Sequence, residues 1–165
     1  MARGRMINVT IAEDETFNAM SIDAQFIFIR TLPHLDRDGL ITGNVILLSS
    51  KVTPLLPEYN QKMTGIFQEW IANGFVMRYQ DGKRDVLFFI NFRKNQFGMR
   101  YEKEGVSQFA PPPGYKRTST GLVPSDTPSN SGNGTNGNFV QDNASTDEVR
   151  PNSVLSAARI EIVVS

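Results

Sequence analysis

Residues 63–92 read MTGIFQEWIANGFVMRYQDGKRDVLFFINF, and they carry the clearest secondary-structure signals of the chain. Its first part carries apolar residues at the three- and four-residue spacing of one helix face: Met63, Ile66, Phe67, Trp70 and Ile71. Gly74 follows, a residue type that readily takes the left-handed conformation found just past helix ends. The pattern therefore predicts a helix over residues 58–73.

The second part of this stretch predicts a β-hairpin. Before Asp81-Gly82 every second residue from Phe75 to Tyr79 is apolar, and the same holds from Val86 to Phe92. Asp-Gly between two such runs is a strong hairpin signal, because both central residues of a type I′ turn need positive φ. We therefore expect two antiparallel strands that turn at Asp81-Gly82.

The upstream sequence predicts shorter elements. Residues 7–11 alternate in polarity, as in a short strand, and residues 40–42 read as extended. Ser21 and Asn44 are suitable N-caps for helices over 22–32 and up to Val52. For the first of these helices a strand is the alternative, because Phe26-Ile27-Phe28-Ile29 is rich in β-formers.

These expectations combine into an α+β fold. Three helices followed by a C-terminal β-hairpin is the order of a winged helix-turn-helix, although other small α+β domains share that order. The folded domain is expected over residues 1–109. Residues 110–153 read as a Pro/Gly/Ser/Asn-rich disordered linker, and residues 154–165 as a short apolar tail or a truncated second module.

Composition limits the function classes. The chain has 165 residues, no cysteine and zero formal net charge, but residues 1–117 hold 15 Lys and Arg against 12 Asp and Glu. A basic body of this kind suggests a polyanionic partner. The lack of thiols, of long apolar runs and of a secretory h-region favours a soluble protein of the cytoplasm, without a membrane partner. No metal-ligand cluster, phosphate-binding loop or catalytic triad is recognisable, so we expect no enzyme, no metal and no cofactor.

The run from Gly74 to Gln96 resembles the N-terminal domains of phage replisome organisers and DnaD-like proteins, which read roughly G-L-I-x-x-Y-x-x-D-G-K-x-Y-L-x-I-x-N-F-x-K-H-Q. The opening Arg5-Met6-Ile7 and the loop LDRDGLI at 35–41 are similar too. The resemblance implies a winged helix that binds double-stranded DNA or self-associates in the bacterial host cytoplasm during replication initiation, with a helicase or helicase loader as a further partner. Asn95 stands where the family usually has a His, and from the sequence we expect the family's second module to be missing or truncated.

In a winged helix the third helix enters the major groove and the wing contacts the backbone. Asn and Gln read adenine edges, and Lys and Arg bind phosphates. The candidate DNA-binding residues are therefore Asn60, Gln61, Lys62, Thr64, Gln68, Lys83, Arg84, Arg93, Lys94 and an N-terminal arm of Arg3 and Arg5. The alternatives are a merely solvated surface, a protein-interaction module of a replisome, and a transcriptional regulator on the same fold.

Overall fold

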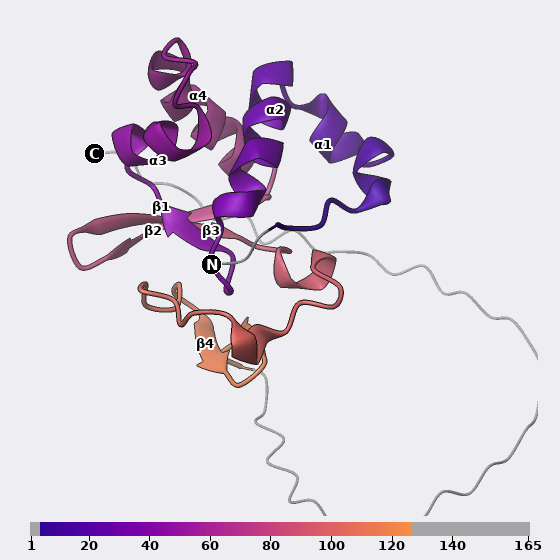
Figure 1. The fold of residues 1–165 in the computed structure, drawn as a ribbon, viewed down its shortest axis with the longest axis vertical. Helices are drawn as coiled ribbons and strands as arrows, with labels where there is room; N and C mark the ends of the chain where they lie inside the picture. The colour runs from indigo at the N-terminus through magenta and orange to yellow at the C-terminus, as the bar shows by residue number, and fades with distance from the viewer. Residues whose placement is uncertain (1–3, 127–165) are drawn as a thin grey trace, which may run out of the picture. The chain divides into compact units, whose positions relative to one another are not determined.

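The computed structural model describes residues 4–126, which form an α+β fold (Figure 1). The expected tail at 154–165 and most of the expected linker lie outside these residues. None of the helices in the described part is long and apolar enough to cross a bilayer. The helices are α1 (Glu15–Ala19), α2 (Ile22–Thr31), α3 (Val45–Val52) and α4 (Tyr59–Ala72), and short 3-10 helices lie before α1, after α2 and after the strand that ends at Phe89.

Side-chain caps set the starts of two predicted helices. The Ser21 hydroxyl accepts a hydrogen bond from the amide of Ala24 at 3.2 Å, and the Asn44 side chain accepts one from Leu47 at 3.1 Å. Each cap satisfies an amide that has no partner within its helix. The predicted helices α2 and α3 are thereby confirmed, and the strand alternative for residues 26–29 is wrong.

The N-terminal segment differs from its prediction. Residues 7–11 were expected to form a strand, but Val9–Ala12 is a 3-10 helix whose N-cap, Asn8, accepts from the amide of Thr10. Val9 is 85% exposed, so the alternating polarity of this segment does not mark a buried face. The following helix α1 was not predicted, because only five residues separate its cap, Asp14, from its end.

Three strands form the main sheet: β1 (Leu40–Thr42), β2 (Val76–Asp81) and β3 (Arg84–Phe89). All pairs are antiparallel, and β3 lies between β1 and β2. The predicted hairpin is confirmed with a shift of one residue. Asp81 pairs with Arg84, so the connecting residues are Gly82 and Lys83, and Gly82 supplies the positive φ of +62°.

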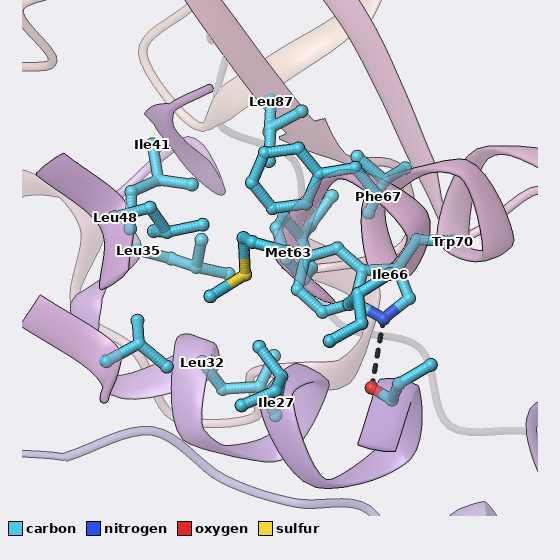
Figure 2. Close-up of a cluster of buried hydrophobic side chains, with 14 of the residues drawn as sticks. Ile27, Leu32, Leu35, Ile41, Leu48, Met63, Ile66, Phe67, Trp70 and Leu87 are labelled. Atoms are coloured by element: carbon cyan, nitrogen blue, oxygen red, sulfur yellow. Dashed lines mark hydrogen bonds between the residues drawn. The ribbon is translucent and has the colours of Figure 1, made fainter. Parts of the chain in front are cut away.

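The helices pack on one face of this sheet around Trp70 (Figure 2). Met63 and Trp70 are completely buried, and Leu87 of β3 reaches the same cluster. The indole N–H of Trp70 donates to the carbonyl of Ala24 at 3.0 Å, which ties α4 to α2. The stripe predicted to face the core therefore does so, except that Ile71 is 38% exposed.

A second small sheet covers the other face of β3. Its strands are β4 (Tyr115–Thr118) and β5 (Gly121–Pro124). Phe88, whose side chain points away from Leu87, packs against Tyr115 with ring centroids 5.0 Å apart. Composition predicts a linker over residues 110–153, whereas the described structure continues in regular strands to Pro124.

Candidate nucleic-acid interface

The outer face of α4 is polar and uncharged. Trp70 and its apolar neighbours turn the opposite side of the helix to solvent. The exposed candidates on that side are Asn60, Gln61, Thr64 and Gln68. Their amide and hydroxyl groups donate and accept hydrogen bonds, which is the chemistry that reads base edges.

Two charged residues of α4 are bound to residues of α2 and of its N-cap. Lys62 forms an ion pair with Asp23 at 2.7 Å, and the same carboxylate accepts from the hydroxyl of Tyr59. These two hydrogen bonds lower the pKa of Asp23, and its carboxylate raises the pKa of Lys62. Glu69 accepts from the amide and the hydroxyl of Ser21, both at 2.8 Å. A half-exposed pair such as Lys62–Asp23 is weak, so Lys62 remains able to exchange this partner for a phosphate.

Gly65 lies at the centre of this face. A methyl group built on its Cα meets nothing within 4 Å, so no contact inside the described structure requires a glycine. Glycine within a helix costs about 1 kcal/mol relative to alanine. An external partner that approaches the helix backbone closely is one physical reason for accepting that cost.

The hairpin tip carries the candidates Lys83 and Arg84. Lys83 is exposed and makes no hydrogen bond or ion pair within residues 4–126. Arg84 forms an ion pair with Asp81 and donates to the carbonyl of Gln108 at 2.9 Å. The tip is thus held against the segment after the sheet, and Lys83 is its most accessible cation.

A second ion pair reduces the charge of the hairpin further. The guanidinium of Arg78 binds both carboxylate oxygens of Asp85, at 2.5–3.0 Å. The local surplus of positive charge that the sequence suggests is therefore partly neutralised. Electrostatic attraction of the hairpin to DNA would depend mainly on Lys83 and on Arg84, whose side chain is 52% exposed.

Arg5, one of the two residues of the predicted N-terminal arm, is engaged within the domain. The Arg5 side chain is only 3% exposed and binds Glu104 at 2.5 and 2.8 Å. It also donates to the carbonyl of Leu35, so Arg5 joins the N-terminal segment to the body. This interaction lowers the pKa of Glu104. Arg3 lies outside the described residues.

Arg93 and Lys94 lie beyond the end of β3 opposite to the hairpin tip. Arg93 donates to the carbonyls of Thr120 and Met99, at 3.2 and 3.4 Å, whereas Lys94 is exposed. The six residues of β3 span roughly 20 Å at 3.3 Å per residue. These two candidates are therefore not grouped with Lys83 and Arg84.

One buried cluster escapes prediction from the sequence. The Asp38 side chain is fully buried and accepts from Arg117 at 2.7 Å and from Tyr101 at 2.6 Å. Burial and this hydrogen bond raise the pKa of Tyr101 to about 12. Asp38 and Arg117 are 79 residues apart in the chain, and no local sequence pattern predicts their pairing.

No protein-family model matches the sequence, and neither a curated protein nor a solved structure shows significant similarity to the chain. The function is therefore inferred from the geometry of these surfaces and from the resemblance of residues 74–96.

Proposed function

We propose that the domain is a winged helix that binds double-stranded DNA, and that its role is in phage-type replication initiation. The element order α2, β1, α3, α4, β2, β3 is that of a helix-turn-helix followed by a wing. In this proposal α4 enters the major groove and the hairpin tip contacts the backbone. The function is binding and not catalysis.

The observation that carries the proposal is the outer face of α4. Asn60, Gln61, Thr64 and Gln68 are all exposed, while Trp70 and the rest of the apolar stripe hold the helix rigidly on the core. A rigid helix with outward amides has the chemistry for direct readout of bases. Because α4 has no excess of positive charge, binding should be moderate and should depend on the wing.

The replication role is supported only by the resemblance of residues 74–96 to replisome organisers. On that basis a helicase or helicase loader is the expected protein partner. A transcriptional role on the same fold is distinguished by whether the bound sites lie in an origin or in a promoter.

Fluorescence anisotropy with a labelled duplex at rising salt concentration tests the DNA contact. Lys83→Gln should weaken binding and flatten the log–log salt dependence by about one unit, because one phosphate contact is lost. Lys103→Gln is the matched control, since Lys103 is an exposed cation outside the proposed interface. No binding at low salt, or equal losses in both variants, would contradict the proposal.

Exposed apolar side chains favour a protein-interaction module as the second candidate. Ile46 of α3 is 77% exposed, and Leu55, in the turn before α4, is 88% exposed. Large exposed apolar residues beside α4 are more useful to a protein partner than to DNA. Light scattering that shows concentration-dependent association, lost in Ile46→Ser and indifferent to DNA, would support this candidate.

A further inference from the structure

A groove of about 470 Å³ lies between the loop that follows α2 and the segment 104–109. Its lining includes His34, Arg37 and Lys51 on one side and Ser107 on the other. The volume falls in the range of about 300–1,000 Å³ that is usual for small-ligand sites. The groove contains none of the candidate residues of α4 or of the hairpin tip.

Arg37 is the unusual residue of this groove. Its guanidinium lies over the ring of Tyr101, 4.3 Å from the centroid, and Tyr101 is held by its hydrogen bond to buried Asp38. Within residues 4–126 Arg37 donates no hydrogen bond, and its Nε is buried without an acceptor. A planar guanidinium fixed by stacking, with its donors unused, is prepared for a planar or tetrahedral oxyanion.

The acidic groups of the groove are engaged elsewhere. Glu104 binds Arg5 with both carboxylate oxygens. Asp36 accepts hydrogen bonds from the amides of Asp38 and Leu40 and from the hydroxyl of Ser107. Burial also raises the pKa of Asp36, which reduces its tendency to carry charge. Neither carboxylate therefore neutralises the Arg37 guanidinium through a hydrogen bond.

A second cation lies at the same groove. Lys51, in the last turn of α3, is exposed and makes no ion pair within the described part of the chain. The pKa of His34 is lowered, first by burial and then by the charges of Lys51 and Arg30. Neutral His34 retains a donor for an oxyanion, so Arg37, Lys51 and His34 offer positive charge and hydrogen-bond donors in one cavity.

We propose that this groove binds a phosphate group, with Arg37 as its principal ligand and Lys51 as the second cation. The phosphate belongs either to a free nucleotide or to a nucleic-acid backbone, since both present the same oxyanion. The inference does not rest on the function of α4 or of the hairpin tip.

NMR of the full chain tests the site at the group concerned. The guanidinium resonances of Arg37 should shift in a saturable way on titration with inorganic phosphate, with deoxyadenosine monophosphate, or with a duplex of about two helical turns. Saturation by the mononucleotide assigns a free-nucleotide ligand, and saturation by the duplex alone assigns the backbone. Absence of a saturable shift with all three probes would overturn the proposal.

Variants separate binding from structural effects. Lys51→Gln removes an exposed cation and should weaken phosphate binding about tenfold, the usual scale for one charge-assisted contact. Lys103→Gln, an exposed cation outside the groove, should leave the affinity unchanged. Arg37→Lys keeps the charge but loses the planar donors, and it should weaken binding while the amide spectrum stays folded. Equal affinities for Lys51→Gln and the unmodified chain would contradict the assignment.

The outcome is independent of the proposed DNA function. If the duplex binds and Lys83→Gln weakens it while Arg37 does not respond to any phosphate probe, the groove proposal fails alone. If the mononucleotide moves Arg37 but the duplex does not bind, the DNA function fails and the phosphate site stands.

Discussion

Trp70 is the single tryptophan of the chain, and its side chain is completely buried. Trp70→Phe removes the hydrogen bond to Ala24 and leaves a cavity between α2 and α4. We expect a loss of about 2 kcal/mol in the free energy of unfolding, measured by urea denaturation followed by circular dichroism. Phe97→Leu, at a position 68% exposed, is the control and should change stability by less than about 0.5 kcal/mol.

The pair of Arg5 and Glu104 should make stability depend on pH in the acid range. Arg5 lowers the pKa of Glu104 in the folded state, so the pair stabilises the fold above the unfolded value of about 4.3. This contribution is lost as the pH falls through the lowered folded pKa. Asp36 acts in the opposite direction, because burial raises its pKa and its protonation favours the fold.

Urea midpoints between pH 3 and pH 7 measure this effect. Glu104→Gln should lower the midpoint at pH 7 and flatten its decline below about pH 4.5. Asp36→Asn should not reproduce the flattening. An unchanged acid limb in Glu104→Gln would show that Arg5 does not bind Glu104 in solution.

Single residues were predictable where local chemistry alone decides. Ser21, Asn44 and Gly82 act within a few residues of their own positions, so the sequence identifies them as caps and a turn. Arg5 was misassigned to a basic arm, because its partner, Glu104, is 99 residues away. The roles of charged residues depend on such distant pairings, and a single sequence does not contain them.

Gly65 is an exposed glycine within α4, and its replacement by alanine tests whether a partner approaches the helix there. Gly65→Ala adds a methyl group in open space and should stabilise the domain by up to about 1 kcal/mol, seen as a higher Tm. If DNA approaches this helix closely, the same methyl group should weaken duplex binding. Higher Tm with unchanged duplex affinity would place the DNA elsewhere than at the centre of α4.

The β4–β5 hairpin is joined to the rest of the domain through Arg117, which binds the buried Asp38 carboxylate. Arg117→Leu leaves the buried Asp38 carboxylate without its cationic partner and should destabilise the domain by about 3 kcal/mol. Arg100→Leu, an exposed cation, is the control and should be nearly neutral. Equal stability of the two variants would mean that the hairpin does not belong to the folded body.

The elements themselves were mostly predictable from periodicity. The helices over α2, α3 and α4 and the β2–β3 hairpin follow from apolar spacing combined with caps and turns. The strands within residues 115–124 were not predictable, because a polar composition indicates a linker. It does not show that Tyr115 and Leu122 cover the second apolar side of β3. The strand expected over residues 7–11 shows the reverse error, in which alternation without burial suggests a strand.

For the molecule as a whole, the arrangement separates two surfaces. The outer face of α4 presents neutral amides, whereas the groove at Arg37 presents unused positive charge. The sequence predicts one DNA interface that combines the amides of α4 with basic residues such as Arg5 and Arg93. In the structure Arg5 and Arg93 instead bind groups of the folded domain itself, as does Arg78 of the hairpin.

If α4 enters the major groove, as we propose, its side-chain amides contact the bases, and NMR of these amides measures that contact. On titration with duplex DNA, the amide resonances of Asn60, Gln61 and Gln68 should shift together and saturate at the affinity measured by anisotropy. Gln25 lies in α2, and its side-chain amide donates to the carbonyl of Met20. Its amide resonance is the control and should not shift. If the duplex binds while the three α4 amides stay in place, α4 does not enter the groove.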